Sequence, residues 1–221
     1  MTATNRLPVV VLISGRGSNL QALIDGQLNG ELAIDIRAVI SNKPDAPGLE
    51  RARRAGIATE VCDHRGYATR ADYDALLRER VAHYNPGLVV LAGFMRILTP
   101  VFVEPFLGRL INIHPSLLPD FRGLDTHRRA LEAGVTEHGC SVHFVTPELD
   151  AGPVIVHARV PVHPDDDETS LEQRVQAAEH QAYPQAVQWL ADARVRLQDG
   201  QLFIDGEPGT TPPQLDTALS G

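Results

Sequence analysis

The sequence predicts an α/β protein with a mainly parallel, doubly wound, Rossmann-like sheet, helices on both faces and antiparallel strands added at one edge. Strands covered on both faces read as continuous apolar runs, and two such runs are Pro8–Ser14 (PVVVLIS) and Leu88–Ala92 (LVVLA). These runs alternate with segments of helical spacing, which indicates repeated strand–helix units. Further along, the alternating pattern of Cys140–Val145 suits an antiparallel strand at the edge.

Length and hydropathy indicate one domain. The chain has 221 residues, 43% of them hydrophobic, which suffices for a single core over residues 1–206. We expect two halves within it, at about 8–105 and 106–206. Residues 207–221 (EPGTTPPQLDTALSG) are polar and rich in proline, so we expect them to form a flexible tail.

Charge and cysteine content exclude several classes of protein. The net charge of −8 argues against binding to nucleic acid, which needs a basic surface. No apolar run approaches the roughly 20 residues that span a bilayer, so we expect no membrane association. The N-terminus lacks the layout of a signal peptide, and Cys62 and Cys140 are the only cysteines. We therefore expect a cytoplasmic, reduced protein without a metal site.

A glycine-rich turn follows the first strand. Gly15–Asn19 (GRGSN) leads directly into LQALIDGQL, which has helical spacing. Strand, glycine turn and helix together are typical of a phosphate site, where backbone N–H groups at the helix start face the anion. Ser18 and Asn19 are candidate helix caps. A tight turn without a ligand is the alternative. Leu20 replaces the third glycine of a dinucleotide motif, and the pattern is not that of a triphosphate loop.

Regular elements fill the next hundred residues. Gly56 is a candidate helix C-cap, and a polar loop over 63–72 is expected before the third helix. Strands are expected at Ile34–Ser41 and Ile57–Cys62, and helices at about 49–56 and 73–84. After the strand Leu88–Ala92 and Gly93, the run Phe94–Leu98 could line a pocket for a flat heterocycle or pack into the core.

The most informative stretch is Leu110–Gly123, LINIHPSLLPDFRG. It begins as a strand in which Asn112 and His114, at positions i and i+2, point to the same side. Pro115 ends the strand, so both side chains lie at a carboxyl end, where open α/β sheets place ligands. An amide donates to a developing oxyanion and an imidazole moves protons, which points to acyl transfer. A turn-holding Asn112 and a structural His114 remain the alternative.

The last part of the chain should complete the sheet. We expect a helix at Thr126–Ala133, a turn at Glu148–Gly152 holding Asp150, a strand at Val154–Val160, a long helix from Ser170 to about Ala191 and a hairpin over Val195–Ile204 turning at Asp199–Gly200. The acidic residues 165–168 precede that long helix, and carboxylates favour a helix N-terminus.

Six segments together resemble the phosphoribosylglycinamide formyltransferase family, folate-dependent enzymes of purine synthesis. They are ISGRGSNLQALID, ISNKPDAPGLERARRAGI, LAGFMRIL, INIHPSLLPDFRG, HGCSVHFVTPELDAGPVI and AAEHQAYP, and the similarity covers roughly residues 8–205 in order and spacing. The resemblance implies transfer of formyl from the co-substrate 10-formyltetrahydrofolate to the amine of glycinamide ribonucleotide, without a metal. It makes the first half the nucleotide-binding half and the second the folate and catalytic half.

The resemblance also implies roles for individual residues. It makes Asn112, His114 and Asp150 catalytic. It places the ribonucleotide at Gly15, Gly17, Ser18, Asn19 and Glu179, with Glu179 receiving the amine end. The folate contacts that it implies are Arg70, Met95, Arg96, Ile97, Leu98 and Asn112.

Several points stay open on sequence grounds. Arg16 and Asp120 depart from what the family pattern leads us to expect, His143 has either a site role or a structural one, and the mobility of residues 138–152 is open. The partners implied are small molecules, and the oligomeric state, including a homodimer, is not decided.

Three rival functions share part of this pattern. A methionyl-tRNA formyltransferase should carry a basic RNA-binding domain, and we expect none in this acidic chain. A formyltetrahydrofolate hydrolase should carry an N-terminal regulatory domain, whereas the first strand here begins at Pro8. A non-catalytic phosphate-sensing module explains the glycine turn but leaves Asn112, His114 and Asp150 without a purpose.

Overall fold

The computed structural model describes residues 6–209 and 212–216. The helices are α1 (Ser18–Asn29), α2 (Gly48–Arg54), α3 (Arg70–His83), α4 (Pro100–Val103), α5 (Thr126–Glu132) and α6 (Glu168–Ala191), with 3₁₀ turns η1 (His64–Gly66) and η2 (Glu104–Phe106). The strands are β1 (Leu7–Ile13), β2 (Ile34–Ser41), β3 (Ala58–Val61), β4 (Leu88–Leu91), β5 (Leu110–His114), β6 (Glu137–Phe144), β7 (Val154–Pro161), β8 (Val195–Gln198), β9 (Gln201–Ile204), β10 (Glu207–Pro208) and β11 (Gln214–Asp216).

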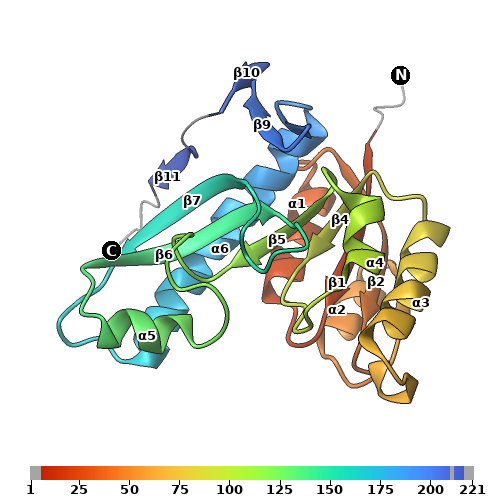
Figure 1. Ribbon diagram of the computed structural model, residues 1–221, viewed down its shortest axis with the longest axis horizontal. Coiled ribbons are helices and arrows are strands. Elements are labelled where there is room, and N and C mark those ends of the chain that lie inside the picture. The colour runs from red at the N-terminus through yellow and green to blue at the C-terminus, as the bar shows by residue number, and fades with distance from the viewer. Residues whose placement is uncertain (1–5, 210–211, 217–221) are drawn as a thin grey trace.

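The main sheet confirms the predicted fold class. Among the described residues it has eight strands in the order β11-β7-β6-β5-β4-β1-β2-β3 (Figure 1). Strands β3, β2, β1, β4 and β5 are parallel, and β6 and β7 then continue the sheet in antiparallel fashion. The chain therefore changes from strand–helix units to hairpin-like pairing immediately after β5, which carries Asn112 and His114.

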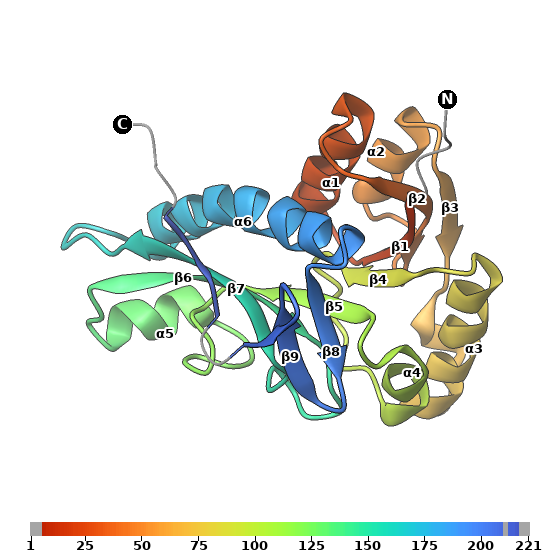
Figure 2. The same ribbon diagram turned by 90° about the horizontal axis from the view of Figure 1, so that it is seen from above.

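Helices cover both faces of this sheet (Figure 2). On one face α1, α2 and α6 pack over apolar side chains such as Val11, Ile111 and Val156. On the other face α3 and α4 cover a second cluster that includes Val10 and Leu12. Successive residues of β1 thus enter opposite cores, as expected of a buried parallel strand, and burial of this kind contributes about 25 cal/mol per Å² of apolar surface.

Most element boundaries agree with the sequence predictions, and the exceptions have local causes. Helix α3 begins at Arg70, inside the expected loop, because Thr69 accepts a hydrogen bond from the Asp72 N–H as its N-cap. Helix α6 begins at Glu168 because Asp167 and Ser170 form a reciprocal capping box. Helix α4 was not predicted, because its four residues are too few to show a helical hydrophobic period.

The segment expected to be a flexible tail contains regular structure. Strand β10 pairs with β9, and β11 pairs in parallel with β7 at the edge of the main sheet. Both strands thus find an open edge to pair with, and flexibility of the segment stays a prediction. Residues 210–211 and 217–221 lie outside the described residues.

No helix in the described part of the chain is both long and apolar enough to cross a membrane.

Candidate active site

The carboxyl ends of three adjacent strands bring the predicted site segments together. Strands β1, β4 and β5 are neighbours in the sheet, and they lead into the glycine turn, the 94–98 segment and the loop after His114. Ser14 links the first two, because its hydroxyl donates to Asn42 Oδ1 at 2.6 Å and accepts from the Met95 N–H at 2.8 Å. Ser14 was not predicted as a site residue, because it ends an apolar strand and nothing in the local sequence indicates these two hydrogen bonds.

The glycine turn owes its shape to close backbone packing. Gly17 is the N-cap of α1 and has φ +72°, a conformation that glycine adopts readily. A Cβ at Gly17 would lie 2.8 Å from the Cα of Gly48, the first residue of α2. A Cβ at Gly15, in contrast, would meet open space among the described residues. Packing against α2 therefore accounts for glycine at position 17, whereas the open space beside Gly15 is available to a ligand.

Ser18 and Asn19 do not cap α1, because Gly17 occupies that position. Their side chains turn to α6 instead. The Gln176 amide donates to Ser18 Oγ at 3.3 Å, and Asn19 Nδ2 donates to Glu179 Oε2 at 2.8 Å. Asn19 and Glu179, 160 positions apart, thus meet at the start of α1, where the backbone N–H groups of a helix are available to bind an anion.

Glu179 is a buried carboxyl group, with 9% of its surface exposed. Burial raises its pKa to about 7, although the hydrogen bond from Asn19 opposes that shift. The Asn19 Oδ1 atom is buried without a protein partner among the described residues. A buried acid that titrates near neutrality beside an unpaired amide oxygen is typical of a binding site.

Asn112, His114 and Asp150 meet at the end of β5. Nδ1 of His114 lies 3.5 Å from Asp150 Oδ2, and both side chains are at least nine-tenths buried. Nε2 of His114 lies 3.0 Å from the carbonyl oxygen of Phe121. Each ring nitrogen of His114 therefore faces a hydrogen-bond acceptor.

The carboxylate reaches His114 through an unusual backbone conformation. Asp150 has φ +48°, and its Oδ2 also accepts the Gly123 N–H at 3.0 Å. Phe121, which supplies the carbonyl beside His114, has φ +52°. Such conformations are uncommon for residues other than glycine and cluster at functional sites.

His143 is a site residue that sequence reasoning left undecided. Strand pairing sets it opposite Asn112, and its Nε2 lies 3.3 Å from Asn112 Nδ2 and 3.8 Å from Asp150 Oδ1. Burial lowers the pKa of His143, so the ring stays neutral. With Nδ1–H donating to the Phe144 carbonyl at 2.9 Å, Nε2 accepts from Asn112 and orients its amide. The register of β5 with β6 was the missing signal.

The predicted folate segment is partly exposed. Met95 and Ile97 have 66% and 52% of their surfaces exposed, whereas Phe94 and Leu98 are buried. The Arg96 guanidinium lies 4.7 Å from the ring centroid of Tyr73 in α3.

The remaining residues of interest lie around these groups. Arg70 is exposed one helical turn before Tyr73. Arg16 forms an exposed ion pair with Glu172 at 3.3 Å, and Asp120 is exposed.

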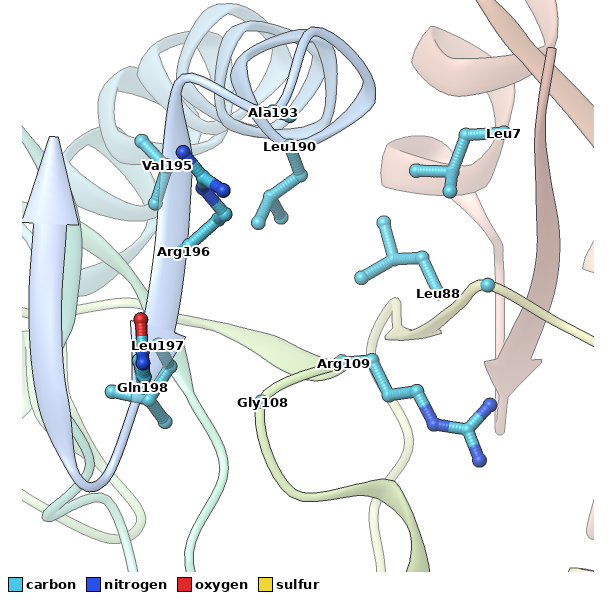
Figure 3. A pocket seen from close by; sticks show the side chains of 11 residues that line it. Leu7, Leu88, Gly108, Arg109, Leu190, Ala193, Val195, Arg196, Leu197 and Gln198 are labelled. Carbon is cyan, nitrogen blue, oxygen red and sulfur yellow. The ribbon is translucent and has the colours of Figure 1, made fainter. Parts of the chain in front are cut away.

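A separate cavity of about 320 Å³ lies at the other end of the strands (Figure 3). It is lined by residues at the starts of β1, β4 and β8, among them Leu7, Leu88 and Val195. The Arg109 guanidinium points away from Leu190 and donates to the carbonyl of Pro86 at 2.7 Å. None of the predicted site residues lines this cavity.

Within residues 6–209 and 212–216, no three His, Cys, Asp or Glu side chains gather in a way that could hold a metal ion.

Comparison with known proteins identifies the family. The sequence pattern of the formyl transferases matches residues 7–187. Phosphoribosylglycinamide formyltransferase of Escherichia coli K12 is 53% identical over 206 residues, covering 93% of this chain and 96% of that protein. The human trifunctional purine biosynthetic protein adenosine-3 is 47% identical over 189 residues, which are 86% of this chain and 19% of that protein.

Solved structures agree. Phosphoribosylglycinamide formyltransferase from Coxiella burnetii superposes with a TM-score of 0.90 at 51% identity, covering 95% of this chain and 99% of that one. Glycinamide ribonucleotide transformylase 1 from Symbiobacterium toebii gives 0.87 at 44% identity, with 90% and 94% covered. The chain belongs to the formyl transferase family, among the phosphoribosylglycinamide formyltransferases.

Proposed function

We propose that the protein transfers the formyl group of 10-formyltetrahydrofolate directly to the primary amine of phosphoribosylglycinamide, in purine biosynthesis. The observation that carries this proposal is the meeting of Asn112, His114 and Asp150 at the carboxyl end of β5, with only β4 between that strand and the one that leads into the glycine turn. Family membership supports the same reaction.

Asn112 and His114 stabilise the charge that develops in the reaction. When the amine attacks the formyl carbon, the carbonyl oxygen becomes an oxyanion in a tetrahedral intermediate. The Asn112 amide, oriented by His143, donates a hydrogen bond to that oxygen, and the His114 ring beside it stabilises the negative charge when it carries a second proton. Removal of one such donor typically costs about 10²–10³ in rate.

His114 also helps to move a proton from the attacking amine toward the leaving folate nitrogen. General acid–base catalysis of this kind contributes about 10²–10⁴. Asp150 stabilises the imidazolium and holds the ring, with its own position held by the Gly123 N–H. The mechanism needs no covalent intermediate with the protein and no metal.

The two substrates bind side by side next to this centre. The ribose phosphate binds at Gly15, Gly17, Ser18 and Asn19, where the first N–H groups of α1 are available to an anion. Glu179 receives the ammonium end of the ribonucleotide. Arg70 and the segment of Met95, Arg96, Ile97 and Leu98 bind the folate, with the exposed Met95 and Ile97 as apolar wall and Asn112 at its formyl end.

The test is the dependence of deformylation on the amine substrate. Purified protein is given 10-formyltetrahydrofolate with and without phosphoribosylglycinamide, and release of tetrahydrofolate is followed. We expect turnover only with both substrates, because orientation of the amine supplies roughly 7–11 kcal/mol of the barrier and water lacks that anchoring. Equal rates without the ribonucleotide would identify a formyltetrahydrofolate hydrolase instead. The His114→Ala protein is the control for background deformylation.

A further inference from the structure

We propose that Ser141 and His157 are positioning residues for the reaction. Resting on the function proposed above, the inference is that this buried pair clamps the loop after β5 and thereby sets the Phe121 carbonyl that faces His114. Ser141 stands opposite His114 in the pairing of β6 with β5, and its side chain hydrogen-bonds to the loop and to His157 rather than to the His114 ring. His157 lies on β7, the next antiparallel strand beyond β6 (Figure 1).

The clamp consists of three hydrogen bonds to one hydroxyl group. Ser141 Oγ lies 2.6 Å from the Ser116 carbonyl oxygen, 2.9 Å from the Leu118 N–H nitrogen and 2.9 Å from His157 Nδ1. Ser141 and Ser116 are fully buried, and His157 has 9% of its surface exposed. Hydrogen bonds in such a setting are costly to leave unmade.

Donor accounting determines the direction of each bond. A serine hydroxyl has one proton and two acceptor lone pairs. The Ser116 carbonyl can only accept, so it takes the hydroxyl proton, and Leu118 N–H can only donate. His157 must therefore donate from Nδ1. Burial, with Arg159 beside it, lowers the pKa of His157, so the neutral ring carries its single proton on Nδ1.

A further hydrogen bond connects the loop residue Ser116 to the residue that precedes Phe121, and the Phe121 carbonyl faces His114. Ser116 Oγ donates to the Asp120 carbonyl at 2.6 Å, and Asp120 immediately precedes Phe121. Phe121 holds its uncommon left-handed conformation while its carbonyl lies 3.0 Å from His114 Nε2. A bulky residue stays in that conformation only when its surroundings over-determine it. The Ser141–His157 pair is one of the contacts that hold Phe121 in this conformation.

Substitutions of His157, which supplies the N–H donor, and of Ser141 test whether the pair affects activity through positioning or only affects stability. His157→Asn keeps an N–H donor close to the position of Nδ1, whereas His157→Leu removes it, and Ser141→Ala removes the hydroxyl. We expect His157→Leu and Ser141→Ala to lower kcat about tenfold with KM for both substrates nearly unchanged. We expect His157→Asn to stay within about threefold of the parent protein. Val156→Ala, a buried neighbour on β7 outside the clamp, should lower Tm and leave kcat unchanged.

Hydrogen exchange gives a readout that is independent of activity. The Leu118 amide should lose protection in Ser141→Ala and His157→Leu and keep it in His157→Asn and Val156→Ala. Lost protection with unchanged kcat, or equal losses of kcat in the Asn and Leu variants, would overturn the proposal. Failure of the proposed function would show differently, as normal turnover in His114→Ala.

Discussion

The glycine turn and the loop after His114 lie at the carboxyl ends of β1 and β5, which β4 separates in the sheet, and their conformations have different origins. The turn after β1 is formed by backbone against backbone, with Gly17 packed on Gly48 of α2. The loop after β5 is held by side chains, because Ser116 and Ser141 bond to its backbone and Phe121 takes a left-handed conformation without being glycine.

This difference shows what each end tolerates. At the turn, an added methyl group is harmful where the backbones touch, while polar side chains matter less for shape. At the loop, we expect the loss of a single hydrogen-bonding group to release the backbone. Substitutions at the two places should therefore differ in whether they change activity, stability or both.

Removal of the reacting groups should have the largest effect and leave the fold intact. We expect Asn112→Ala and His114→Ala each to lower kcat by about 10²–10⁴, because each removes a donor to the oxyanion or a proton carrier. Steady-state kinetics and circular dichroism measure the two properties separately. Near-normal turnover in either variant would take that residue out of the mechanism.

Gly15→Ala and Gly17→Ala form a matched pair at the turn. Gly17→Ala should lower the free energy of unfolding by about 1–3 kcal/mol, because its Cβ meets Gly48 and its φ is positive. Gly15→Ala should leave stability unchanged and raise KM for the ribonucleotide, because only the phosphate would occupy that space. Thermal unfolding and kinetics decide this, and an unchanged KM for Gly15→Ala would contradict the phosphate assignment.

Glu179 should make ribonucleotide binding depend on pH near neutrality. Its pKa of about 7 means that the carboxylate, which pairs with the ammonium, forms as pH rises through 7. KM for the ribonucleotide should therefore fall over that interval in the parent protein and not in Glu179→Gln. Glu168→Gln, an exposed carboxyl group on the same helix, is the control.

The same shift has a consequence for stability. The folded state holds the Glu179 proton more tightly than the unfolded state, whose pKa is near 4.5. The contribution of Glu179 to stability is thus present below 4.5 and is lost as pH rises toward 7. In Glu179→Gln this slope of the unfolding free energy should disappear from denaturant titrations.

His138 should give the smallest effect, on acid stability beside the loop after His114. Burial, together with the nearby His127 and His114, lowers its pKa to about 4. Its contribution to stability is present above about 6.5 and is lost as pH falls through 4. His138→Phe should therefore unfold at lower pH than the parent, while the exposed His163→Phe should not. Equal acid midpoints in all three proteins would count against this.

The sequence could predict features of the glycine turn and of the β5 end only where the interacting residues are close together along the chain. The spacing of Asn112 and His114 on one strand is local, so sequence reasoning placed both at the carboxyl end of β5. The contacts of Asn19 with Glu179 and of Asn112 with His143 depend on the packing of α6 and the register of β6. No local pattern encodes those.

The positive φ angles of residues other than glycine could not be predicted from the sequence either. Phe121 and Asp150 have no local reason for that conformation, which the surrounding hydrogen bonds impose.

Strand β11 has a consequence for how the protein behaves among its own copies. Without it, the outer edge of β7 would offer a row of unpaired backbone groups, and such an edge is a template for aggregation. Pairing with Gln214–Asp216, and the bond from His157 N–H to the Pro213 carbonyl, satisfies part of that row. The three residues of β11 thus cover part of the edge of β7 with a very short strand, which makes pairing of this sheet edge with a second molecule less favourable.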